Sequence, residues 1–161
     1  MKIMFAIFVV TGTAIGLSVP VAKSPAPVIA AVAAAVPPED KPVDTVLERT
    51  QSGHFLAVAD VNGEPINFVV DTGADVVALT MEDAKRAHID FDPGQFQVIG
   101  SGASGDVRGQ EVHINKIVLD GKRATDLSGV VLEGSRISLL GHSYLRHLSD
   151  VRIKGDEMIL R

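Results

Sequence analysis

One acidic side chain lies where two apolar segments meet. Asp71 follows the apolar run at residues 66–70, and a short turn separates it from a second run at residues 76–79. Both runs have the length and composition of buried strands. A carboxylate beside buried strands costs free energy unless it is paired, hydrogen-bonded or used in catalysis. Residues 71–74 add a hydroxyl group and a glycine to this carboxylate, so they form a candidate catalytic loop.

A second motif lies at residues 139–145, where two leucines and Gly141 lead into the sequence His-Ser-Tyr-Leu. Together with the Asp-Thr-Gly-Ala loop, it resembles the retropepsin-like aspartic protease family, in its bacterial, membrane-linked form with a single Asp-Thr-Gly. The resemblance extends over roughly residues 54–161. It implies that Leu140, Gly141 and His142 belong to a strand and a following helix that brace the catalytic loop.

The resemblance also implies a reaction. Aspartic proteases activate water with two carboxylates that share a proton. This chain has one Asp-Thr-Gly, and a domain of roughly 110 residues is half the size of a two-lobed protease. The family supplies the second carboxylate through a homodimer, in which each subunit contributes Asp71 across a two-fold axis. The expected activity is that of an endopeptidase on an extended polypeptide, without a cofactor or a metal.

The neighbours of Asp71 take roles from the same resemblance. Thr72 is expected to hydrogen-bond to its own copy across the dimer interface and to hold the loop. Gly73 is expected to let the backbone approach the substrate, and Ala74 keeps the floor of the site small.

Asp75 and His142 occupy positions at which retroviral members carry an Asp and an Arg that form an ion pair. One hypothesis is that Asp75 pairs with protonated His142, which would couple assembly to acidic pH. The alternative, which the sequence favours at least as strongly, is that both side chains are solvated.

A glycine-rich segment at residues 100–105 is the candidate flap, the β-hairpin that closes over the substrate in this family. Gly100 and Gly102 would permit the hinge motion, and Ser101 could offer a hydrogen bond to a bound peptide. An ordinary mobile surface loop is an equally good interpretation. Bacterial membrane-linked relatives usually carry a Thr-Ala-Asn-Gly-like element here, and this chain departs from it.

Short apolar runs and glycine-rich turns predict a mainly β domain, a small closed barrel of the acid-protease (retropepsin) type with one or two short helices. Asn62-Gly63 predicts a hairpin turn, and Thr80 predicts the N-cap of a helix over residues 81–87. Strands are expected at residues 54–61, 66–70, 76–79, 96–99, 107–119, 137–140, 151–153 and 158–160, and Gly121 is expected to turn the 107–119 strand into a further one.

The N-terminal part of the chain is predicted to target the protein. Residues 3–22 carry no charge, which is typical of an appended apolar helix that acts as a signal anchor or as a cleaved signal peptide. The flanking lysines would place the remainder outside the cytosol, on the periplasmic side of a bacterial inner membrane or secreted. Residues 23–51, rich in Pro and Ala, are predicted to be a linker before the domain at 52–161.

Composition excludes several other classes. The net charge of -5 and the absence of a basic run argue against nucleic-acid binding, and the lack of Cys excludes disulfides and thiolate chemistry. Aromatic residues make up only 4%, so the core must consist mainly of Val, Ile, Leu and Ala. The alternative function is a non-catalytic peptide-binding or dimerisation module on the same fold.

Overall fold

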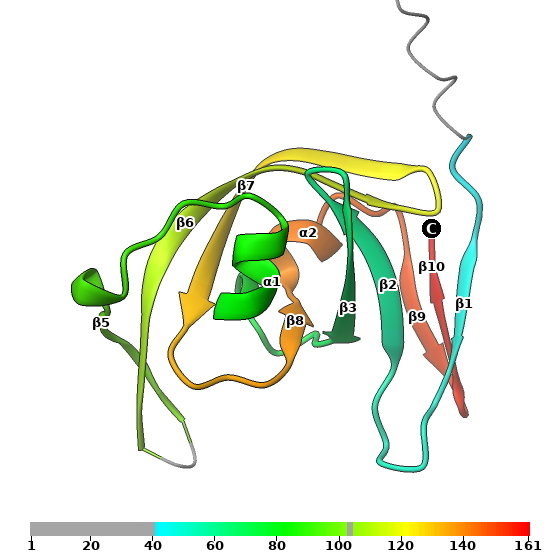
Figure 1. Cartoon of the computed structure of the whole chain (residues 1–161). Coiled ribbons are helices and arrows are strands. Elements are labelled where there is room, and N and C mark those ends of the chain that lie inside the picture. The colour runs from blue at the N-terminus through cyan, green and yellow to red at the C-terminus, as the bar shows by residue number, and fades with distance from the viewer. Residues whose placement is uncertain (1–40, 103–104) are drawn as a thin grey trace, which may run out of the picture. The chain divides into compact units, whose positions relative to one another are not determined.

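The computed structural model describes residues 41–102 and 105–161. The predicted anchor or signal peptide and most of the predicted linker therefore lie outside the described residues. Within the described ranges, no helix combines the length and hydropathy that a membrane crossing requires. The domain is mainly β with two short α-helices (Figure 1), which confirms the predicted fold class.

Six strands close into a barrel in the order β2-β3-β8-β4-β7-β6. The barrel closes where Asp60 and Val61 of β2 pair with Val118 and Ile117 of β6. Strand β5 (Gln97–Gly102) extends the sheet beyond β6. The barrel strands are β2 (Leu56–Val61), β3 (Glu64–Val70), β4 (Val77–Thr80), β6 (Gly105–Leu119), β7 (Lys122–Leu132) and β8 (Ser138–Leu140).

Two tight turns connect the long hairpins. Asn62 and Gly63 both have positive φ angles, 55° and 101°, as do Asp120 and Gly121, at 47° and 75°. Two successive residues in this region are typical of the type I′ turn, which matches the right-handed twist of the flanking strands. The predicted hairpin at Asn62 is therefore confirmed. Its side chain also accepts a hydrogen bond from the amide of Lys116, which ties the turn to β6.

Parallel pairing in the middle of the sheet sets up the functional region. Strand β3 runs parallel to β8, and β4 pairs with β8 on the other side. The ends of β3 and β8 are therefore adjacent, although 70 residues separate Val70 from its partner Leu140. Sequence alone predicts both strands, but this parallel pairing is a property of the tertiary fold.

The two helices are short and capped differently. Helix α1 (Met81–Arg86) begins after Thr80, whose hydroxyl oxygen accepts a hydrogen bond from the amide of Asp83, as the sequence predicts. Helix α2 (His142–Leu145) follows Gly141 directly. A 3-10 turn, η1 (Pro93–Gln95), was not predicted. It forms because the Asp92 carboxylate accepts the amide N–H of Gly94, which is a local pattern that Asp commonly adopts.

Three further strands form a separate sheet in the order β1-β10-β9, with bounds β1 (Thr45–Glu48), β9 (Val151–Lys154) and β10 (Glu157–Leu160). Strand β1 falls inside residues 23–51, which the sequence analysis assigned to a linker, so the folded domain begins earlier than predicted. The composition of this short strand is unremarkable, and its partner β10 lies more than 100 residues away. No local signal therefore marks it.

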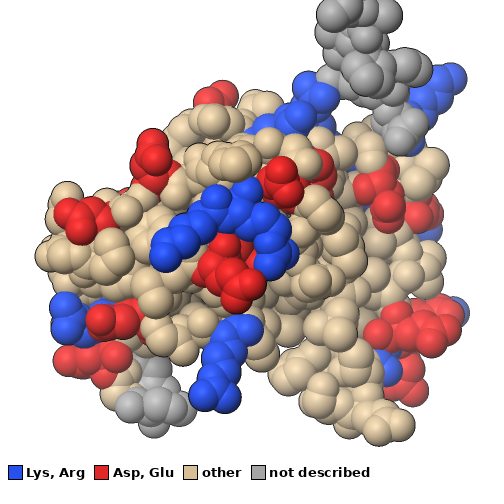
Figure 2. All heavy atoms as spheres, viewed as in Figure 1, with Lys and Arg blue, Asp and Glu red and all other residues tan. Residues whose placement is uncertain are grey.

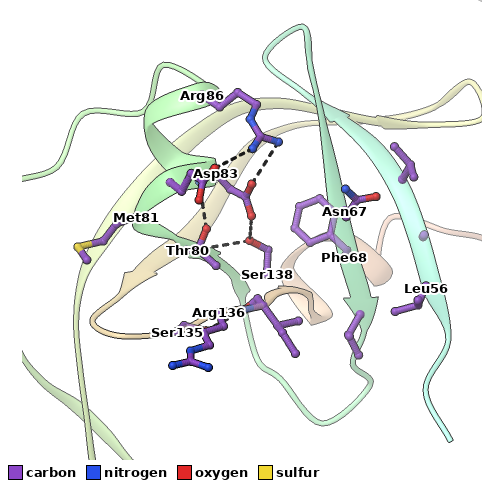
Figure 3. A pocket seen from close by; sticks show the side chains of 15 residues that line it. Leu56, Asn67, Phe68, Thr80, Met81, Asp83, Arg86, Ser135, Arg136 and Ser138 are labelled. Atoms are coloured by element: carbon purple, nitrogen blue, oxygen red, sulfur yellow. Dashed lines mark hydrogen bonds and ion pairs between the residues drawn. The ribbon is translucent and has the colours of Figure 1, made fainter. Parts of the chain in front are cut away.

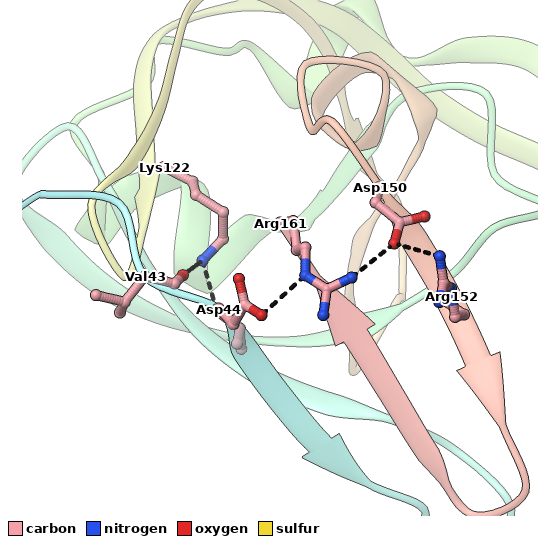
Figure 4. Close-up of polar contacts among 7 residues, drawn as sticks. Val43, Asp44, Lys122, Asp150, Arg152 and Arg161 are labelled. Atoms are coloured by element: carbon pink, nitrogen blue, oxygen red, sulfur yellow. Dashed lines mark hydrogen bonds and ion pairs between the residues drawn. The ribbon is translucent and has the colours of Figure 1, made fainter.

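A buried lysine anchors the start of this strand. The Lys122 ammonium group donates hydrogen bonds to the carbonyl oxygen of Val43 and to the Thr45 hydroxyl oxygen (Figure 4). Burial lowers the pKa of Lys122, and the nearby carboxylates of Asp120 and Asp44 oppose this shift. The lysine is tolerated in the interior because its donors are satisfied.

A second polar contact secures the C-terminal residue. The Arg161 guanidinium contacts Asp44, which precedes β1, and Asp150, which precedes β9 (Figure 4). The pKa of Arg161 is raised, first by the hydrogen bond to Asp44. Both ends of the described chain are therefore fastened to the same small sheet.

We predict that the single tyrosine titrates abnormally. Burial raises the pKa of Tyr144 above its usual value of about 10, and the nearby Asp120 carboxylate adds to this shift. The folded state keeps the proton that the unfolded chain loses, so stability should fall above pH 10 by up to about 1.4 kcal/mol per pH unit. Because the chain has one Tyr and no Trp, tyrosinate absorbance reports this group alone.

The measurement compares folded protein with protein unfolded in urea. Absorbance of tyrosinate should appear at clearly higher pH in the folded sample. Coincident titration curves would contradict the prediction, and Tyr144→Phe provides the spectroscopic blank.

Candidate active site

Asp71 stands at the end of β3, where the parallel strand β8 holds the backbone. The Asp71 amide donates to the carbonyl oxygen of Leu140 at 3.1 Å. The Asp71 Oδ1 atom accepts the amide N–H of Gly73 at 2.8 Å, while the Oδ2 atom has no hydrogen-bond partner among the described residues. One carboxylate oxygen is thus stabilised by the loop and the other remains available on a partly exposed side chain.

Gly141 allows the catalytic loop and the β8–α2 junction to touch. A Cβ atom at residue 141 would lie 2.2 Å from the carbonyl oxygen of Val76 and 2.8 Å from that of Ala74. The amide of His142 then donates to the Ala74 carbonyl oxygen at 2.8 Å. Only glycine fits this approach, because any side chain would have to displace backbone.

A buried serine of α2 holds the end of the same loop where β4 begins. The Ser143 hydroxyl oxygen accepts the amide N–H of Val77 at 2.9 Å, and Ser143 is only 2% exposed. Val77 is fully buried and begins β4. The loop between β3 and β4 is therefore held at both ends, by Leu140 and by Ser143.

A cleft of about 1070 Å³ opens above this loop. Asp71, Gly73 and Ala74 line one side, and Gly100 and Ser101 of β5 line another. The structure thus brings the predicted flap segment and the predicted catalytic loop to one cleft. Gly102 lies at the tip of the β5–β6 hairpin, where it pairs with Gly105.

The cleft has a further wall that the sequence analysis did not identify. Glu111 and His113 of β6 and residues 128–130 of β7 line it, together with Leu132. The His113 Nε2 atom lies 3.5 Å from the Asp126 Oδ1 atom on the neighbouring strand. Alternation along β6 predicts which residues are exposed, but it does not tell which exposed residues face a cleft.

Three further residues that the sequence assigned to the site are exposed or line the cleft. Thr72 is exposed and its hydroxyl group has no hydrogen bond within the described chain. Asp75 lines the cleft and His142 is exposed at the start of α2. No ion pair joins Asp75 and His142 in the part of the chain that the structure describes.

Comparisons with known proteins agree with this geometry. Residues 57–147 match the family described as gag-polyprotein putative aspartyl protease. The match spans both motifs and more than half of the chain, so the protein belongs to this retropepsin-like aspartic protease family.

Relatives and solved structures extend the finding. An uncharacterized protein of Rickettsia prowazekii (strain Madrid E) is 35% identical over 118 residues, which cover 73% of this chain and 51% of the relative. An uncharacterized protein from the cobV 5′ region of a Sinorhizobium species is 32% identical over 120 residues, covering 73% of this chain and 52% of that protein. The chain therefore spans about half the length of these curated relatives.

The crystal structure of a retropepsin-like aspartic protease from Rickettsia conorii superposes with a TM-score of 0.61 at 34% identity. The superposition covers 73% of this chain and 90% of that one. This similarity supports the fold described above, including the barrel that carries the loop.

We predict that Gly141→Ala strongly destabilises the domain. The added methyl group overlaps the Val76 carbonyl oxygen, so the loop must move at a cost of about 2 kcal/mol or more. Urea unfolding measures this loss. Gly100→Ala is the matched control, because a Cβ atom at residue 100 meets nothing within 4 Å. Equal stabilities of the two variants would refute the role of Gly141.

Proposed function

We propose that the protein is an aspartic endopeptidase that acts as a homodimer. The observation that carries the proposal is the Asp71 carboxylate, which lies in a cleft with one oxygen hydrogen-bonded to Gly73 and the other available. Membership of the aspartyl protease family supports the hydrolytic chemistry. The substrate class is a polypeptide that binds in extended conformation.

The reaction needs two Asp71 side chains, one from each subunit. The ionised carboxylate accepts a proton from a water molecule as the water oxygen attacks the scissile carbonyl carbon. The protonated carboxyl group of the other subunit donates its proton to the carbonyl oxygen, which gives a tetrahedral diol. Return of a proton to the amide nitrogen then lets the C–N bond break, releasing a carboxylic acid and an amine.

Features of the single chain support a symmetric partner. The described residues give Asp71 no side-chain hydrogen bond to a second acid, so one chain holds half of a catalytic pair. The Thr72 hydroxyl group also lacks a partner within the described chain. A two-fold axis near residue 71 places each group opposite its own copy.

Location is part of the proposal. Residues 1–22 are proposed to direct the domain out of the cytosol, either as a membrane anchor or as a cleaved leader. An anchor would raise the effective concentration of the second subunit, because both subunits would be confined to one membrane.

A peptide-binding module without catalysis is the second candidate. The cleft itself favours it, since an extended peptide can bind there without being cut. The intact Asp-Thr-Gly loop favours catalysis, because binding alone does not require an available carboxylate in the cleft.

We predict that Asp71→Asn abolishes hydrolysis. The full-length chain is incubated with an unstructured protein substrate across the acidic pH range, with and without pepstatin. Parent activity should be blocked by pepstatin, and the variant should lose about three orders of magnitude in rate or more, because the amide cannot accept the proton of water. Asp90→Asn, at an exposed residue outside the cleft, is the control. Cleavage that persists in Asp71→Asn would exclude the proposed mechanism.

We also predict that activity depends on assembly. Sedimentation of the full-length chain should show a dimer at concentrations where cleavage occurs, and specific activity should fall on dilution, because a separated subunit has half of the catalytic pair. Full activity of a sedimenting monomer would contradict the dimer.

A further inference from the structure

A second hollow lies outside the catalytic cleft. It has a volume of about 710 Å³ and lies between strands β2 and β3 on one side and helix α1 on the other (Figure 3). Leu56, Val58, Val69 and Ile137 contribute apolar side chains to it. We call this hollow the lateral groove.

The apolar lining of the lateral groove is unusual for its position. Side chains on β2 alternate between the core and the outside, and Ala57, Ala59 and Val61 are the buried members. An outer face is normally polar, yet Leu56 is 54% exposed and Val58 is 59% exposed. Ile137, before β8, is 53% exposed. Clustered exposed aliphatic residues of this kind mark interaction sites.

The α1 side of the groove is polar and already satisfied. The Ser138 hydroxyl group donates to the Asp83 carboxylate at 2.6 Å and accepts the amide N–H of Thr80 at 3.1 Å (Figure 3). Arg86 forms ion pairs with Glu82 and Asp83. These groups form a prearranged wall in which each charged side chain already has a partner, although two carboxylates share the single guanidinium.

Unlike the charged side chains of that wall, Arg136 has no polar partner in the described part of the chain. It lines the groove beside Ile137, is exposed, and has no hydrogen bond or ion pair among the residues that the structure describes. Basic and acidic side chains gather together over α1, whereas the surface beside them over β2 and β3 is largely uncharged (Figure 2). The groove therefore presents an apolar strip with Arg136 at its lip, a positive side chain that has no ion-pair partner among the described residues.

The lateral groove adjoins the catalytic loop through two paired strands. Val69 precedes Asp71 by two residues, and it pairs with Leu139 of β8. Ile137 directly precedes β8, and the carbonyl oxygen of Leu140 at the end of β8 accepts the Asp71 amide N–H. The groove and the loop that carries Asp71 are therefore both attached to the paired strands β3 and β8.

We propose that the lateral groove binds an apolar segment of the polypeptide substrate that carries an Asp or Glu side chain, outside the residues held in the cleft. The aliphatic side chains of the segment pack on Leu56, Val58 and Ile137, and its carboxylate pairs with Arg136. This inference rests on the proposed function, because it assigns a substrate feature to the same enzyme.

A binding experiment tests the groove without requiring catalysis. Full-length Asp71→Asn protein is titrated into two fluorescent peptides, Gly-Leu-Val-Glu-Leu-Gly and the counterpart with Lys in place of Glu, in the presence of saturating pepstatin. Anisotropy should show tighter binding of the Glu peptide. Adding Arg136→Glu should reverse the preference and weaken binding of the Glu peptide by about fivefold to tenfold. Val58→Asp should weaken both peptides by about tenfold.

Matched variants separate folding from binding. Arg136→Gln removes the charge with little change of size, and circular dichroism checks that each variant is folded. Lys154→Glu reverses a charge at an exposed residue of β9, outside the groove, and should leave both affinities unchanged. A Glu preference that survives both Arg136 variants overturns the proposal.

Other occupants give different results. If a second copy fills the groove, Val58→Asp should dissociate the dimer in sedimentation while neither peptide binds. If residues 1–40 fill it, their removal should be required for peptide binding. Either result overturns the assignment to substrate.

Kinetics distinguish failure of this inference from failure of the proposed function. With active enzyme, Arg136→Glu should raise KM for a substrate extended by the Leu-Val-Glu-Leu segment by about fivefold and leave kcat unchanged. The same substrate without the extension should show no change in either constant. Absence of any cleavage by the parent would refute the protease, whereas equal KM changes for both substrates would refute the groove.

Discussion

The structure depends on the contact between Gly141 and the loop that carries Asp71. Strands β3 and β8 run side by side, so their ends must share a small space in which backbone meets backbone. Absence of a side chain at residue 141 permits this approach, and the His142 amide then donates a hydrogen bond to the Ala74 carbonyl oxygen. The position of the carboxylate follows from that contact, because Asp71 is itself held by Leu140.

Buried hydroxyl groups reinforce this arrangement at low cost. Ser143 and Ser138 are both almost fully buried, and each accepts an amide N–H from one end of β4. A buried hydroxyl group without a partner would destabilise the fold, whereas here each hydroxyl oxygen accepts a backbone N–H. Strand β4 is thus fixed at Val77 and at Thr80, and the loop before it has little freedom. In the proposed homodimer, a rigid loop suits a carboxylate that meets a second carboxylate at a fixed distance.

The domain carries two hollows of different chemistry. The cleft includes the Asp71 carboxylate and polar groups from β5 and β6, whereas the lateral groove is an apolar strip with a basic lip. Asp71 of the cleft directly follows β3, and Val69 of β3 lines the groove, so the Asp71 loop and the groove are attached to one strand. In the proposed enzyme, substrate contacts far from the scissile bond can then contribute to binding without altering the reacting groups.

The sequence by itself determined the barrel strands, the hairpin at Asn62, the cap at Thr80 and the turn that carries Asp71, because each has a local signal in turn chemistry or periodicity. It also placed residues 139–145 beside the loop, through the family resemblance. Strand β1, the Lys122 anchor, the cleft wall at Glu111 and His113, and the lateral groove were decided by the tertiary structure. These features join residues far apart in the chain, and exposure on a strand does not reveal which surface the exposed side chain will face.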